Sequence, residues 1–108
     1  HENSSAASDV YKRQEQCQFI DSLGVEGLKK FEWYVDKETN TATLIEEFDN
    51  AESFKEIATK AIGTPVNLKF REIANFDNMT ILGNVSVEMK ENLAAMGPKI
   101  KTYQAGLN

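Results

Sequence analysis

A chain of 108 residues has room for one small domain, and 41% hydrophobic residues, 27% charged residues and two prolines are typical of a folded globular protein. The formal charge of -5 argues against duplex nucleic acid and anionic membranes as partners, because both require clustered Lys and Arg. No apolar run reaches the length of a membrane span or a secretory signal, so we expect a cytoplasmic protein.

The segment at residues 4–14, SSAASDVYKRQ, matches the translation of a transposase-type sequencing adapter. We therefore expect residues 1–14 to be an adapter-derived artefact, as in a translated fragment of environmental DNA, and the domain to occupy residues 15–108. His1, the only histidine, then belongs to the artefact, so we exclude catalysis and metal binding by histidine. Cys17 is the only cysteine, so an internal disulfide is excluded and a buried thiol is expected.

Residues 15–23 are predicted to form the last turns of a helix. Phe19, Ile20 and Leu23 recur at helical spacing, and Gly24 follows as a stop. The helix is expected to continue backward through the adapter-like segment, whose residues are acceptable helix formers.

Two alternating segments, residues 28–35 and 41–48, are predicted to form an antiparallel hairpin around turn residues 36–40. On the first strand Phe31, Trp33 and Val35 share one face, and Glu32 and Tyr34 the other. On the second strand the two faces carry Leu44, Glu46 and Phe48 against Thr43, Ile45 and Glu47.

The second half of the chain is predicted to be mainly helical. Asp49 or Asn50 can cap a helix, with Glu52 placed as in a capping box, and the apolar stripe of that helix comprises Phe54, Ile57, Ala58, Ala61 and Ile62. Gly63 ends it, and Thr64 and Pro65 begin a short helix with Val66, Phe70 and Ile73. A third strand is expected within residues 78–85, where Gly83 marks a bulge or an end. Ser86 caps a helix carrying Met89, Leu93 and Met96, which Gly97 and Pro98 close before a short final strand.

Two strings, FEWYVDKETNTATLIEEFDNAESF at residues 31–54 and ILGNVSVEMKENLAAMGPK at residues 81–99, resemble the antibiotic biosynthesis monooxygenase type of dimeric α+β barrel. The resemblance implies an α+β fold in which a ferredoxin-like subunit forms a homodimeric α/β barrel. It also implies that this chain lacks the family's first strand, which lies centrally in the sheet. Many relatives carry a histidine at the position of Ile57, so a mechanism that uses this histidine is not carried over.

The resemblance implies a cofactor-independent monooxygenase that acts on a small aromatic or quinol-like substrate, with no metal and no cofactor. Glu46, the only acid on its predicted face, is the candidate catalytic base. Trp33, Tyr34 and Phe48 are candidate substrate-binding residues, and Asn84 is a candidate hydrogen-bond donor to the ligand.

Plainer interpretations stay open for each of these residues. The glutamates can pair with Lys29, Lys30 or Arg71 or face water, and the aromatic residues can form an ordinary core. The alternative function is a non-catalytic dimeric domain that binds a small molecule or takes part in a stress response, because a fold does not by itself determine function.

Overall fold

The computed structural model describes residues 2–68 and 76–107 of an α+β protein, as the sequence predicts. The chain divides into two compact units, His1–Ala74 and Asn75–Asn108, each with its own two-stranded sheet. Neither sheet closes into a barrel within the residues that the structure describes. The predicted residues Phe70 and Ile73 lie outside the described part of the chain.

The first unit begins with helix α1, Glu2–Ser22, which Gly24 follows as predicted. This helix runs without a break from the adapter-like segment into residues 15–22, as expected from the helix-forming residues on both sides. Gln16 and Ile20 are buried on α1, whereas Gln18 is exposed, so the helix presents one side to the rest of the unit.

Strands β1, Leu28–Asp36, and β2, Thr41–Phe48, form the predicted antiparallel hairpin. Its register places Phe31 opposite Glu46 and Trp33 opposite Leu44. A bulge at Lys29 separates the pair Leu28 and Phe48 from the pair Lys30 and Glu47. Burial confirms the two predicted faces in the middle of the hairpin, because Phe31 and Trp33 are less exposed than Glu32 and Tyr34. On β2 the less exposed residues are Leu44, Glu46 and Phe48. Val35, predicted on the same face as Phe31, is 46% exposed near the turn.

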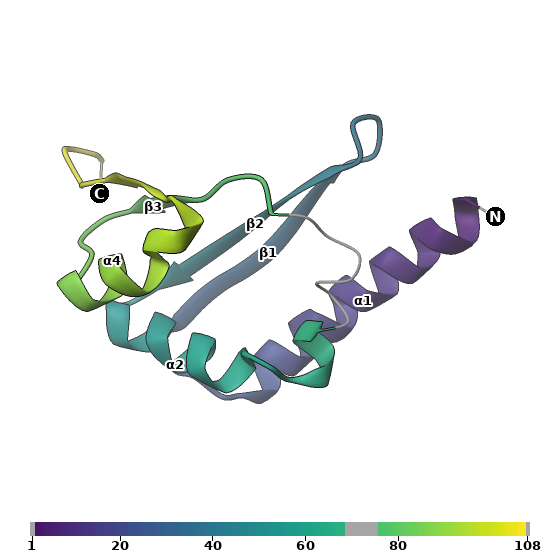
Figure 1. Ribbon diagram of the computed structural model, residues 1–108, viewed down its shortest axis with the longest axis horizontal. Coiled ribbons are helices and arrows are strands. Elements are labelled where there is room, and N and C mark those ends of the chain that lie inside the picture. The colour runs from purple at the N-terminus through teal and green to yellow at the C-terminus, as the bar shows by residue number, and fades with distance from the viewer. Residues whose placement is uncertain (1, 69–75, 108) are drawn as a thin grey trace. The chain divides into compact units, whose positions relative to one another are not determined.

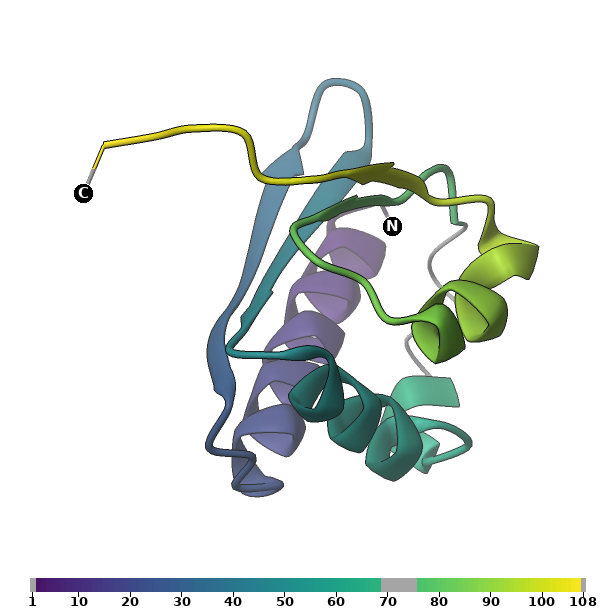
Figure 2. The same ribbon diagram turned by 90° about the vertical axis from the view of Figure 1, so that its left-hand side faces the viewer.

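Helices α1 and α2, Ala51–Ala61, lie against the same face of the hairpin (Figures 1 and 2). The core where they meet contains Ile20 of α1, Val25 of the following loop and Ile57 of α2. Partly buried apolar side chains of both helices and both strands surround it: Phe19, Leu23, Leu28, Phe31, Phe48 and Ala61. We call the helix-covered side of the hairpin the inner face.

The predicted apolar stripe of α2 is too wide. Ile57 is buried and Phe54 and Ala61 are partly buried, but Ala58 is exposed and Ile62 is 71% exposed. The prediction for Ile62 is wrong because the helix ends at Ala61. Ile62 takes an extended backbone conformation, which turns its side chain away from the stripe. The cap is Asn50, whose Oδ1 accepts hydrogen bonds from the Ser53 backbone N–H and hydroxyl.

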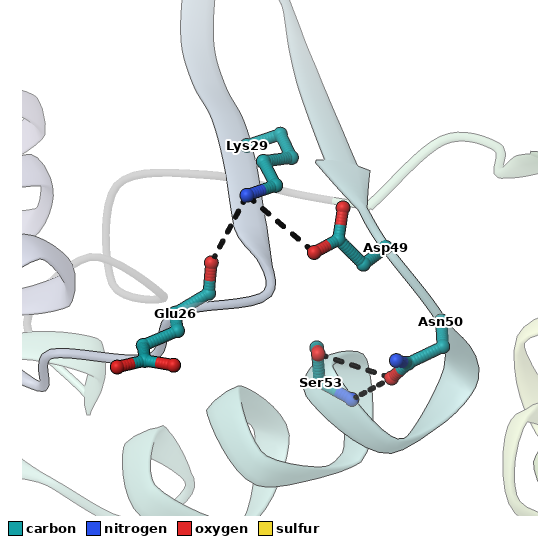
Figure 3. Close-up of polar contacts among 5 residues, drawn as sticks. All are labelled: Glu26, Lys29, Asp49, Asn50 and Ser53. Carbon is teal, nitrogen blue, oxygen red and sulfur yellow. Dashed lines mark hydrogen bonds and ion pairs between the residues drawn. The ribbon is translucent and has the colours of Figure 1, made fainter.

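The loop between α1 and β1 is tied closely to the start of α2. The Asp49 backbone N–H donates to the Gly27 carbonyl oxygen at 2.8 Å. Lys29 Nζ donates to the Glu26 carbonyl oxygen and lies 3.4 Å from Asp49 Oδ2 (Figure 3). A Cβ on Gly27 would overlap the Ser53 hydroxyl and lie 2.5 Å from Ser53 Cβ, so the approach requires glycine.

We expect Gly27→Ala to destabilise the protein by about 1–3 kcal/mol, since the added methyl group displaces Ser53 and disturbs the N-terminal cap of α2. Urea denaturation measures the loss. The double variant Gly27→Ala/Ser53→Gly removes both overlapping atoms and should lose less stability than the sum of its two single changes. Additive losses would show that the close approach does not cause the effect.

The second unit contains β3, Thr80–Leu82, α4, Val87–Leu93, the 3-10 helix η1, Ala94–Met96, and β4, Lys99–Lys101. Strands β3 and β4 pair in parallel, which confirms the short final strand. The predicted third strand is shorter than residues 78–85, because Gly83, at φ 111°, leaves the extended conformation. Ser86 caps α4 as predicted, accepting from the Met89 backbone N–H at 3.1 Å.

Candidate functional site

The inner face of the hairpin brings together three of the predicted site residues: Glu46, Trp33 and Phe48. Glu46 lies opposite Phe31, and Trp33 is its diagonal neighbour on the adjacent strand. Diagonal neighbours on one face are within reach of long and aromatic side chains. The strand alternation therefore places one carboxylate among aromatic side chains on the side of the hairpin that the helices cover.

The Glu46 carboxyl group is partly buried in this apolar setting. Among the residues that the structure describes, it has no hydrogen-bond or ion-pair partner. Loss of solvent around the carboxylate raises the pKa of Glu46 above its ordinary value of 4.5. A carboxyl group with a raised pKa is a better proton acceptor near neutral pH than an ordinary glutamate, which suits a general base.

The raised pKa of Glu46 predicts a pH-dependent stability. The folded chain holds this proton more tightly than the unfolded chain does, so the free energy of unfolding should fall as pH rises from 4.5 through the folded pKa. Well below pH 4.5 both states are protonated, and Glu46 then does not change the free energy of unfolding. In Glu46→Gln this fall should vanish, and the variant should be more stable than the parent at about pH 7.

Urea denaturation of parent and variant at several pH values measures this difference. Glu47→Gln, a neighbouring change on the exposed face, is the matched control and should stay within about 0.5 kcal/mol of the parent. If Glu46→Gln is the less stable protein at neutral pH, the carboxylate has a stabilising partner and this explanation is wrong.

Trp33 and Phe48 contact different helices. The Trp33 indole N–H donates to Gln16 Oε1 of α1 at 3.0 Å. The ring of Phe48 meets the ring of Phe54 of α2 edge to face, with centroids 5.4 Å apart. Helix α1 therefore contacts the inner face at Trp33, and helix α2 contacts it at Phe48.

Gln16 was not predicted as a site residue. Among the described residues it is the polar residue that is buried, with an exposed fraction of 7%. A signal for it exists in the sequence. Gln16 lies four residues before Ile20, so it belongs to the helical stripe that points to the core.

The two remaining predicted residues lie elsewhere. Tyr34 is 55% exposed on the face of the hairpin opposite to Trp33, so these two residues do not line one surface. A hydrogen bond from its hydroxyl to Glu32 Oε1, 3.0 Å long, and the nearby charge of that carboxylate raise the pKa of Tyr34. Asn84 is exposed between β3 and α4 in the other unit.

A hollow of about 240 Å³ lies where the C-terminal half of α1 meets β1. Its lining residues are Cys17, Ile20, Asp21, Leu28, Lys29, Lys30 and Phe31. Phe31 is the cross-strand partner of Glu46, so the hollow adjoins the inner face. Cys17 is partly buried instead of fully buried, and desolvation raises the pKa of its thiol, which makes the reactive thiolate less populated.

A larger open hollow of about 490 Å³ runs over the solvent side of α2 and contains none of the predicted site residues. Its lining is mostly polar or charged, with Asn50, Glu52, Ser53, Lys55, Glu56, Thr59 and Lys60. Lys60 and Glu56 form an ion pair there at 2.8 Å, one turn apart on the helix. This arrangement is typical of a solvated helix surface.

Within the described residues, no group of three or more His, Cys, Asp or Glu side chains is placed to hold a metal ion. The helices of the same part of the chain include none that is long and apolar enough to cross a membrane. Comparison with protein-family models, curated proteins and solved structures finds no match to this chain.

Proposed function

We propose that this chain is a cofactor-independent monooxygenase of the antibiotic biosynthesis monooxygenase type, acting on a small aromatic or quinol-like substrate. The observation that carries the proposal is the placement of Glu46. A single partly buried carboxyl group lies among Phe31, Trp33 and Phe48 on the inner face of the hairpin. An apolar aromatic surface with one polar group is typical of a site for a flat apolar ligand.

The chemistry of such a site requires little from the protein. Glu46 accepts a proton from an acidic C–H or O–H of the substrate, and the resulting anion reduces oxygen directly. For a methylene group between aromatic rings, CH₂ and O₂ give C=O and H₂O, so the substrate supplies all the electrons. The aromatic side chains hold the ring system and exclude water from the anion.

The proposed fold is a ferredoxin-like subunit. The order of helix, antiparallel hairpin and helix in the first unit, with α1 and α2 on one face of the hairpin, supports it. The outer face of the hairpin exposes Tyr34 and Ile45, at 55% and 44%, which supports pairing of two copies into a dimer. Size-exclusion chromatography with light scattering tests the dimer.

Oxygen uptake with a panel of aromatic quinols and anthrone-type methylene compounds tests the activity. The proposal expects substrate-dependent oxygen consumption above the rate without protein, with one product carbonyl formed for each O₂ consumed. Product analysis under ¹⁸O₂ should show one labelled oxygen atom in the product. Oxygen consumption equal to the background for every compound would reject the enzyme.

One observation favours the second candidate, a non-catalytic dimeric domain that binds a small molecule. Ile57, at the position where many relatives carry a histidine, is 4% exposed and belongs to the core of the first unit. A core residue there supplies packing instead of acid-base chemistry. Binding of a panel compound that quenches Trp33 fluorescence, without oxygen uptake, would select this second function.

A further inference from the structure

Among the described residues, the contact between α1 and β1 contains one buried polar side chain. Gln16 is 7% exposed, and the neighbouring inward residues Phe19 and Ile20 are apolar. Burial of an amide costs free energy unless it forms hydrogen bonds. The Gln16 side-chain carbonyl oxygen accepts a hydrogen bond from the Trp33 indole N–H at 3.0 Å, which links the helix to the strand.

This bond restricts the orientation of the indole. Indole has a single N–H, so a fixed acceptor selects both the rotamer and the direction in which the ring lies. Trp33 is only partly buried, so a hydrogen bond to a buried acceptor restricts its ring further. Because Trp33 is the diagonal neighbour of Glu46, the bond also sets which part of the indole adjoins the carboxyl group.

We propose that Gln16 is a positioning residue, which holds the Trp33 indole in the orientation that aligns a flat aromatic substrate with the Glu46 carboxyl group. This inference rests on the proposed function, since it concerns the same site. Gln16 acts through Trp33 and takes no part in proton transfer. Its loss should therefore weaken the alignment of the substrate more than the chemical step.

The only tryptophan of the chain is Trp33, so its fluorescence reports on this bond without a label. Gln16→Met keeps the length of the side chain and removes the acceptor. Gln18→Met is the matched control, since Gln18 is exposed on the same helix. Time-resolved anisotropy should show a larger fast component, from rapid motion of the indole, in Gln16→Met but not in Gln18→Met.

A rescue variant separates the hydrogen bond from packing. Gln16→Glu keeps an acceptor oxygen at the same position, so its anisotropy should resemble that of the parent. If Gln16→Met does not fold, Gln16→Asn takes its place, because the shorter amide cannot reach Trp33. If the indole moves no faster in Gln16→Met, or in Gln16→Asn where that variant replaces it, than in the parent, the proposal is overturned.

Kinetics complete the test. With a quinol that the parent oxidises, Gln16→Met should raise KM about fivefold, the size of one lost neutral hydrogen bond, and leave kcat within about twofold. Unchanged KM despite a mobile indole also overturns the positioning role. If the parent neither oxidises nor binds any compound of the panel, the proposed function fails. The anisotropy measurement still decides whether Gln16 holds Trp33.

Discussion

Glu46→Gln should abolish substrate-dependent oxygen uptake, with a fall in kcat of roughly 10²–10⁴-fold. Glutamine has nearly the shape of glutamate but cannot accept the proton, so the substrate anion that reduces oxygen does not form. The affinity for a neutral aromatic ligand should change little, because the aromatic side chains beside Glu46 remain in place. An oxygen electrode measures kcat, and quenching of Trp33 fluorescence measures the affinity.

The control for this loss is Glu47→Gln, because Glu47 is the next residue on β2 and lies exposed on the opposite face. It should keep the parent kcat within about twofold. Glu46→Gln is expected to be at least as stable as the parent at neutral pH, so its inactivity would not reflect unfolding. A Glu46→Gln variant with the parent's kcat would remove Glu46 from the mechanism.

Ile57→Ala should destabilise the first unit by about 2–4 kcal/mol. Ile57 is 4% exposed and joins α2 to Ile20 and Val25, the other two buried apolar residues of a small core. Truncation leaves a cavity that so few neighbours cannot refill. Urea denaturation followed by Trp33 fluorescence measures the loss, because Trp33 lies on the face that this core covers.

Ile62→Ala is the matched control, with the same change five positions along the chain. Ile62 is 71% exposed, so the control should lose no more than about 0.5 kcal/mol. If Ile57→Ala does not fold, Ile57→Val should still show a loss of about 0.5–1.5 kcal/mol. Equal losses at positions 57 and 62 would show that the core does not lie where α2 meets the hairpin.

The sequence predicted the elements of the first unit because their signals are local. Alternation in residues 28–35 and 41–48 assigned Trp33 and Glu46 to specific faces, and the structure confirms those faces. Capping was predicted to within one residue at Asn50 and correctly at Ser86, because a cap depends on the residues of a single turn. The same alternation placed the candidate site residues Trp33, Glu46 and Phe48 on one face.

Errors arose where a pattern continued past the end of its element. Ile62 fits the spacing of α2 but follows its last residue, and residues 78–85 read as one strand although only Thr80–Leu82 pairs with β4. Gly83 ends β3 on its C-terminal side, which the sequence allowed. On the N-terminal side the length of β3 depends on its partner, because β4 pairs with three residues only, and the spacing of residues in β3 carries no information on that partner.

Residues that share a face could be predicted from the sequence, since the periods of helix and strand are properties of the local backbone. Which face is covered, and by which helix, depends on the packing of distant segments and became known from the structure. The burial of Gln16 against Trp33, the separation of Tyr34 from Trp33 and the close approach of Gly27 to Ser53 all follow from the packing of α1 and α2 on the hairpin. These contacts join residues far apart in the chain. Their free energy depends on the distances between side chains of different elements, which cannot be predicted from a local sequence pattern.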